Sequence, residues 1–139
     1  MSLLDENIYE TTGFDVVVQK LCESLSHAGF SQSENCYFKT FKYSELFGEL
    51  PKYYFDNLYH CRILFEEEQI FLKISQDPIC YLCYKNKLIE YNMPGFCYSI
   101  CIKLYQCRRI DDIINIIKNI IIREEEKCIK KNIKILCNN

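Results

Sequence analysis

The chain has 139 residues, of which 49% are hydrophobic and 26% charged, and it holds only four glycines and three prolines. This composition excludes a fibrous or low-complexity protein, and the length predicts that residues 1–139 form a single domain. The net charge of −2 is uneven, because residues 1–70 carry five basic and twelve acidic side chains whereas residues 71–139 carry twelve and seven.

The ten cysteines bear on the cellular compartment. Residues 1–9 do not show the basic and then apolar pattern of a secretory signal, and the chain holds no Asn-x-Ser/Thr acceptor. The cysteines lie in apolar stretches, where a free cysteine behaves as a small hydrophobic residue. We therefore expect a cytoplasmic protein with reduced thiols. The most apolar run, residues 110–122, is interrupted by charged and polar residues, so no membrane span is expected.

The first predicted element is an amphipathic helix that begins near residue 14 and ends before Gly29. Its apolar stripe recurs at intervals of three and four residues and consists of Phe14, Val17, Val18, Leu21, Leu25 and Ala28. Thr12 and Asp15 are a predicted capping pair, and Gly29 is a typical helix stop.

Alternation of apolar and polar residues then predicts a series of strands joined by short turns. The predicted strands are residues 36–43, 59–65, 70–74, 79–84, 88–91 and 96–107. Residues 44–57 read as a loop or short helix with many aromatic side chains. In the hairpin of residues 59–65 and 70–74, Cys61 is expected in the core and His60 on the polar side, with Glu66–Glu68 at the turn.

The last predicted helix runs from a cap at Asp111 to about residue 131. Its expected buried side chains are Ile113, Ile114, Ile117, Ile120, Ile121 and Cys128. Residues 133–137 are predicted to form a short final strand. The fold class is therefore α+β: an N-terminal amphipathic helix, a five- to six-stranded mainly antiparallel sheet, and a long C-terminal helix packed on the sheet.

No motif fixes a reaction, a metal or a cofactor. The spacing of Cys80, Cys83, Cys97 and Cys101 is close to that of a zinc finger. In strands, however, Cys80 and Cys83 point to opposite faces, while Cys97 and Cys101 lie about 13 Å apart at roughly 3.3 Å per residue. Neither His27 nor His60 has an evident cysteine partner, and the four glycines are too scattered for a phosphate loop.

The runs of like charge have local explanations. Asp111–Asp112 suits a helix cap, Glu66–Glu68 a hairpin tip, and Glu124–Glu126 the surface of the last helix. A basic patch for nucleic acid would consist of Arg108, Arg109, Lys127, Lys130, Lys131 and Lys134. The pI of about 5.7 disfavours that partner.

Protein recognition is the remaining function. Tyrosine gives a large, rigid contact area with a polar tip, and the chain has eleven of them. The predicted partner-binding residues are Tyr53, Tyr54, Asp56, Glu66, Glu67 and Glu68, an acidic and aromatic surface for a basic partner. We expect a non-catalytic immunity or antitoxin-type inhibitor that neutralises a basic toxin such as a nuclease. The alternatives are a secretion-type chaperone or adaptor for an effector, and then a small cysteine-dependent enzyme or zinc protein. The sequence does not set the oligomeric state.

Overall fold

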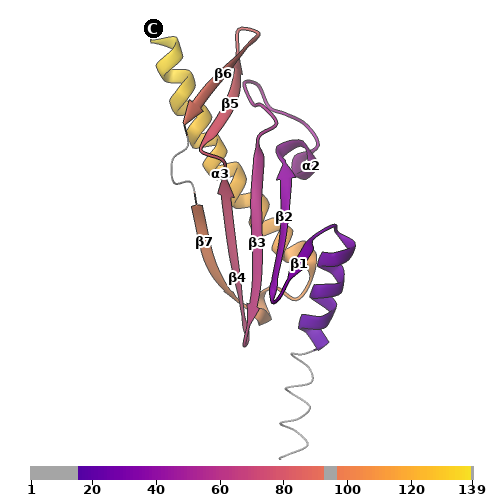
Figure 1. Cartoon of the computed structure of the whole chain (residues 1–139). Helices are drawn as coiled ribbons and strands as arrows, with labels where there is room; N and C mark the ends of the chain where they lie inside the picture. The colour runs from indigo at the N-terminus through magenta and orange to yellow at the C-terminus, as the bar shows by residue number, and fades with distance from the viewer. Residues whose placement is uncertain (1–15, 93–96, 139) are drawn as a thin grey trace, which may run out of the picture.

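The computed structural model describes residues 16–92 and 97–138 (Figure 1). The N-terminal helix covers residues 16–27. The elements that follow are β1 (Ser31–Ser33), β2 (Cys36–Lys42), α2 (Tyr43–Phe47), β3 (Leu58–Glu66), β4 (Gln69–Gln76), β5 (Ile79–Tyr84), β6 (Lys87–Asn92), β7 (Cys97–Lys103), the 3-10 helix η1 (Leu104–Gln106) and α3 (Ile110–Cys137). The predicted α+β fold class is confirmed.

Five strands form one antiparallel sheet in the order β1-β2-β3-β4-β7, and β5 and β6 pair with each other in a second sheet. The β3–β4 hairpin turns at Glu67, which has a φ of 56°. From Glu66 opposite Gln69, its register continues without a break to Tyr59 opposite Gln76. The β5–β6 hairpin is inserted between β4 and β7, so that β7 returns to pair with β4.

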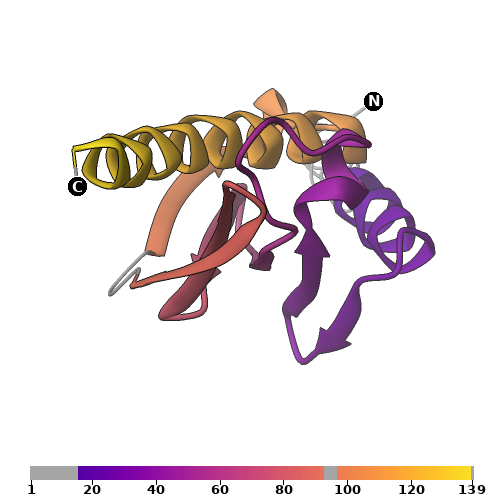
Figure 2. The same ribbon diagram turned by 90° about the horizontal axis from the view of Figure 1, so that it is seen from above.

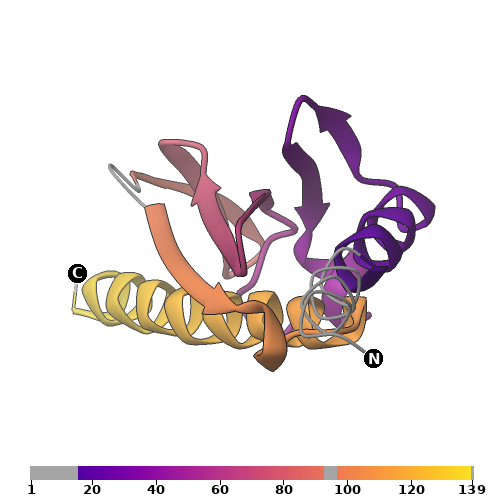
Figure 3. The ribbon, with the colours of Figure 1, turned by 90° about the horizontal axis from the view of Figure 1, so that it is seen from below.

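Both long helices lie on the same side of the five-stranded sheet. Figures 2 and 3 show α3 running across this side, with the N-terminal helix beside the first part of α3. Leu21 and Leu25 of the N-terminal helix share one buried cluster with Ile113, Ile117 and the inward side chains of the strands. Burial of this amphipathic stripe, rather than the modest helix propensity of isoleucine, therefore holds α3 in place.

The N-terminal helix ends at Gly29, as predicted. Gly29 has a φ of +93°, a conformation that side chains with a Cβ rarely adopt. Its N–H donates to the Ser26 carbonyl at 3.1 Å, and the Phe30 N–H donates to the Leu25 carbonyl at 2.9 Å. These bonds satisfy carbonyls that the helix end would leave without partners. The predicted cap at Thr12 and Asp15, and Phe14 of the apolar stripe, lie outside the described residues.

A second, smaller core lies between the β5–β6 hairpin and the C-terminal half of α3. Cys80, Leu82, Tyr91 and Ile129 are buried there, with Ile133 and other partly buried side chains around them. This contact explains why the predicted final strand at residues 133–137 is wrong. The apolar stripe of α3 continues to Leu136 because the hairpin provides a surface for it to cover, so the helix ends only at Cys137.

Three further boundaries differ from the predictions. The strand predicted at 96–107 ends at Lys103 and is followed by η1, while residue 96 lies outside the described part. The short edge strand β1 was missed, because its three residues are polar and exposed and show no apolar alternation. The N-cap of α3 is Arg109 rather than Asp111, and the Arg109 backbone N–H donates to the Asp112 carboxylate at 3.2 Å. Among the described residues, no helix is both long and apolar enough to span a membrane.

Candidate functional site

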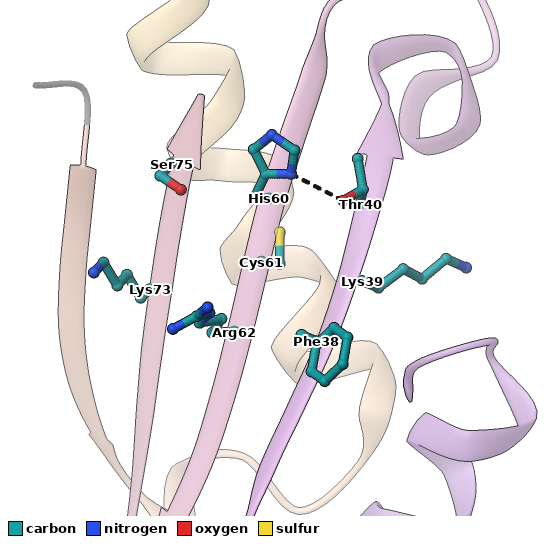
Figure 4. Close-up of a pocket in the computed structure, with 8 residues that line it drawn as sticks. All are labelled: Phe38, Lys39, Thr40, His60, Cys61, Arg62, Lys73 and Ser75. Atoms are coloured by element: carbon teal, nitrogen blue, oxygen red, sulfur yellow. Dashed lines mark hydrogen bonds between the residues drawn. The ribbon is translucent and has the colours of Figure 1, made fainter. Parts of the chain in front are cut away.

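Within residues 16–92 and 97–138, no other element covers the face of the five-stranded sheet turned away from α3, and we call it the open face. It is formed by the residues that alternate with the buried ones on β2, β3, β4 and β7. They are Cys36, Phe38, Thr40, Lys42, Leu58, His60, Arg62, Leu64, Glu66, Gln69, Phe71, Lys73, Ser75, Cys97, Ser99, Cys101 and Lys103. Figure 4 looks onto this face, with α3 behind the strands.

The strand register sets these side chains in rows across the sheet. In one row, Phe38 lies opposite Arg62, Arg62 opposite Lys73, and Lys73 opposite Ser99. The next row, nearer the end of β4, holds Thr40, His60, Ser75 and Cys97. The row nearer the β3–β4 turn holds Cys36, Leu64, Phe71 and Cys101. A hollow of about 380 Å³ lies over the first two rows.

Arg62 and Lys73 are two cations in direct cross-strand opposition. Side chains that face each other in this way have Cβ atoms about 4.5–5.5 Å apart, and like charges there are destabilising. Among the residues that the structure describes, neither cation has a carboxylate within 4.0 Å. The pair therefore concentrates positive charge at the centre of the open face without an internal partner.

A polar chain borders the hollow. The Thr40 hydroxyl lies 2.9 Å from His60 Nδ1, and His60 Nε2 lies 2.9 Å from an Asp77 carboxylate oxygen. A hydroxyl, an imidazole and a carboxylate in this order are also the parts of a hydrolase triad. Here, however, backbone N–H groups point within the plane of the sheet, so they do not converge above the Thr40 hydroxyl as an oxyanion hole would require. The geometry favours a link between β2, β3 and the end of β4.

Two residues that line the hollow have structural roles. The Lys39 amine donates to the Ala28 carbonyl at 2.6 Å and lies 4.8 Å from the centre of the Phe41 ring. It thus points away from the hollow and ties the end of the N-terminal helix to β2 (Figure 4). Cys61 faces the core, as predicted, and burial raises the pKa of its thiol to about 12. A thiol with this pKa is protonated at neutral pH and is a poor nucleophile.

The structure does not bring the predicted partner-binding residues together. Tyr53 and Tyr54 lie near the start of β3, and Glu66–Glu68 lie at the other end of this nine-residue strand, whose ends are about 26 Å apart at roughly 3.3 Å per residue. Asp56 accepts hydrogen bonds from the Ser44 N–H at 2.8 Å and the Ser44 hydroxyl at 2.5 Å, and so it holds the start of α2.

The surroundings of the two tyrosines also differ from the expectation. Tyr54 is half-buried against Tyr43, with ring centres 5.1 Å apart. Tyr53 lines a hollow with Lys52, Tyr84 and Lys85, so its neighbours are basic rather than acidic. The predicted combination of acidic and aromatic side chains occurs instead at the β3–β4 turn. There, Glu67 and Glu68 line a hollow with Lys103 and the exposed Tyr105, a tyrosine that the sequence analysis did not single out.

The structure reveals a buried carboxyl group at Glu125 of α3, which is only 1% exposed. The Tyr59 hydroxyl donates a hydrogen bond to it. Gln76 Nε2 and the Tyr91 hydroxyl also donate to it, each at 3.4 Å. Burial raises the pKa of the Glu125 carboxyl, and these hydrogen bonds together with one from Asn57 oppose part of the rise. None of these partners is a cation, so the charged form of the carboxyl is poorly compensated.

The prediction that residues Glu124–Glu126 lie on the helix surface is therefore wrong for Glu125. Its position did carry a signal, because Ile113, Ile117, Ile121, Glu125 and Ile129 recur at intervals of four residues and share one face of the helix. The carboxyl joins the two cores, since Tyr59 belongs to the main cluster and Tyr91 to the smaller one. Its place in the interior marks it as a structural junction rather than a surface site.

None of the ten cysteines is in a disulfide. Cys80 is buried and Cys83 exposed, which confirms that the two point to opposite faces of β5. Cys97 and Cys101 are both exposed on β7, opposite Ser75 and Phe71. Within residues 16–92 and 97–138, no three side chains of histidine, cysteine, aspartate or glutamate gather closely enough to hold a metal ion.

Comparison of the chain with protein-family models, with curated proteins and with solved structures finds no match.

Proposed function

We propose that this chain is a non-catalytic binding protein that receives a protein partner on the open face of its five-stranded sheet. The observation that carries the proposal is the exposure of large apolar side chains on a sheet face that no helix covers in the part of the chain that the structure describes. Phe38 is 40% exposed, Phe71 38% and Leu58 38%. The solvent side of an antiparallel sheet is ordinarily polar, and apolar groups gathered around charged ones are typical of an interface.

The chemistry of the face supports binding rather than catalysis. Cys61, which lines the hollow, points into the core with a raised pKa. The exposed thiols of Cys97 and Cys101 lie on β7, separated from His60 by β4. Thr40 and His60 face each other on the regular β2–β3 ladder, where backbone donors point within the sheet rather than at the Thr40 hydroxyl, and Asp77 follows the end of β4. The remaining groups can recognise a partner through charge and apolar contact.

The charges at the ends of the open face favour protein over nucleic acid. Arg62 and Lys73 are flanked by carboxylates in both strand directions, at Glu66 near the β3–β4 turn and at Asp77 after β4. A nucleic acid strand carries negative charge along its whole length, so it would meet these carboxylates wherever it extended beyond the two cations. A protein segment places its charges individually and avoids that repulsion.

A toxin inhibitor, which is the function expected from the sequence, is one form of this binding function. It stays a prediction, as does the chaperone alternative, because no contact in the structure selects one class of protein partner over another. The two forms differ in assembly, since the chaperone is expected to be a dimer. Gel filtration of the purified chain separates them.

The proposal is tested with two variants of the full chain as bait for proteins of its own cell. Phe38→Ser with Phe71→Ser removes the apolar groups of the open face, while Leu88→Ser removes a more exposed side chain, at 54%, from β6. A protein retained by the wild type and by Leu88→Ser but lost by the double variant is then purified and titrated by calorimetry.

We expect the Kd for that protein to rise by about tenfold or more in the double variant, because truncation of an apolar interface anchor commonly costs more than about 1 kcal/mol. The Leu88→Ser variant should bind like the wild type. If every protein retained by the wild type is retained equally by the double variant, with unfolding free energies unchanged, the open face is not the binding site.

A further inference from the structure

We infer that the segment which docks on the open face carries its charges in a fixed order, with carboxylates at its centre and cations at both ends. This inference rests on the proposed function and adds the chemistry of the partner. Its basis is the order of charge along the β3–β4 hairpin, which runs acidic, basic, acidic over the open face.

The basic centre is the row of Arg62 and Lys73. The two side chains face each other across the hairpin, and among the described residues no carboxylate pairs with either of them. Keeping two cations opposed costs stability. A carboxylate brought between them by a partner accepts hydrogen bonds from the guanidinium and the ammonium group, and charge-assisted bonds of this kind are stronger than neutral ones.

The acidic ends lie on opposite sides of this centre. Glu66 is four residues from Arg62 on β3, a Cα separation of about 13 Å at roughly 3.3 Å per residue. Asp77 follows the end of β4, four residues after Lys73, and its carboxylate contacts His60 in the row next to the two cations. Glu67 and Glu68 add charge at the first end and are exposed. Asp77 remains exposed although it contacts His60.

Lys103 adds a positive charge beside the acidic end at the β3–β4 turn. It lies opposite Gln69, which itself lies opposite Glu66, so one cation shares this row on the side of β7. A second cation, Lys42 on β2, lies opposite Leu58 at the other end of the face. The order acidic, basic, acidic therefore follows the β3–β4 hairpin rather than the strands on either side of it. We place the docked segment along this hairpin, with Phe38 on β2 beside its centre and Phe71 on β4 one row nearer the turn as apolar contacts.

The test uses synthetic peptides of identical composition and about 12 residues, a length that covers both ends at roughly 3.3 Å per residue. One has glutamates at the centre and lysines at both ends, the second has the reverse order, and the third alternates the charges. A single-stranded oligo-dT is the fourth probe. Each is titrated into the isotope-labelled full chain, and backbone amide shifts give both the Kd and the location.

The expected result is binding of the glutamate-centred peptide about tenfold or more tighter than the other two orders, with shifts centred on residues 60–64 and 71–75. Lys73→Glu should remove this preference, whereas Lys87→Glu, which reverses an exposed charge on the β5–β6 hairpin, should keep it. Equal binding of the three peptides, no binding of the glutamate-centred one, shifts elsewhere, or tighter binding of oligo-dT overturns the inference.

These outcomes are separate from those of the partner experiment. If the Phe38 and Phe71 variant loses its protein partner while the peptides show no dependence on charge order, the binding function stands and the charge order is wrong. If the variant keeps every partner, the binding function itself fails.

Discussion

The Tyr59 hydroxyl on β3 donates a hydrogen bond to the Glu125 carboxylate on α3, 66 positions later in the chain. Gln76 of β4 and Tyr91 of β6 donate to the same carboxylate. Four elements thus meet at one buried acceptor, which fixes how α3 and the β5–β6 hairpin sit on the sheet. A helix held only by isoleucines could shift along the sheet more easily, because apolar contact has little directionality.

We expect Glu125→Gln to stabilise the protein relative to the wild type as the pH rises. Burial raises the folded-state pKa of Glu125 above its ordinary value of 4.5. The protonated carboxyl therefore contributes fully below pH 4.5, and its contribution is lost as the pH rises through the folded-state pKa. Glutamine stays neutral at every pH and avoids this loss.

The measurement is urea unfolding of both proteins at several pH values. The difference in unfolding free energy should grow in favour of Glu125→Gln from about pH 4.5 upwards, by at most ~1.4 kcal/mol per pH unit for one group. A difference that stays constant across this range would show that the carboxyl does not titrate differently in the folded protein.

Glu125→Ala should have the opposite effect from Glu125→Gln, because it removes the acceptor and leaves the buried donors of Tyr59, Tyr91 and Gln76 without their partner. An unsatisfied buried polar group costs about 1–3 kcal/mol. The adjacent Glu126→Ala is the matched control. It removes an exposed carboxylate whose contact with Lys130 is an i,i+4 surface pair, worth about 0.3–0.5 kcal/mol. Equal losses for the two variants in urea unfolding would contradict the role of Glu125.

Thiol reactivity should divide the cysteines by exposure. The four exposed thiols, Cys83, Cys97, Cys101 and Cys137, are expected to react rapidly with Ellman's reagent at pH 8. Cys61 and Cys80, whose pKa burial raises to about 12, should react only when the protein unfolds. Substitution of each cysteine by serine assigns the fast reactions. A rapid reaction at Cys61 in the folded protein would contradict the orientation of β3.

The sequence predicts much of the sheet because alternation determines which strand residues face inward. Cys61 and His60 were placed correctly in this way. The end of α3 was not, because Ile133 and Leu136 are compatible with either strand or helix until the β5–β6 hairpin is seen to cover them. Short apolar runs are decided by such tertiary contact rather than by local propensity.

The candidate site was harder to predict than the core. Arg62 and Lys73 are opposed only because the turn lies at Glu67 and Glu68, and a shift of one residue in register would place each strand's side chains on the opposite face. The predicted partner-binding residues were instead charged and aromatic residues close together in the chain. The structure separates Tyr53 from Glu66–Glu68 and places Tyr105 near the latter.

The Lys73→Glu variant tests most directly whether the open face is a binding surface. The measurement is its unfolding free energy and its Kd for the purified partner, both on the same sample. Replacing one of two opposed cations creates a cross-strand ion pair with Arg62, so we expect stability to rise by about 0.2–1 kcal/mol. Binding should weaken by about tenfold or more, since the partner loses its cationic centre. A variant that is more stable and binds as tightly as the wild type would contradict the account.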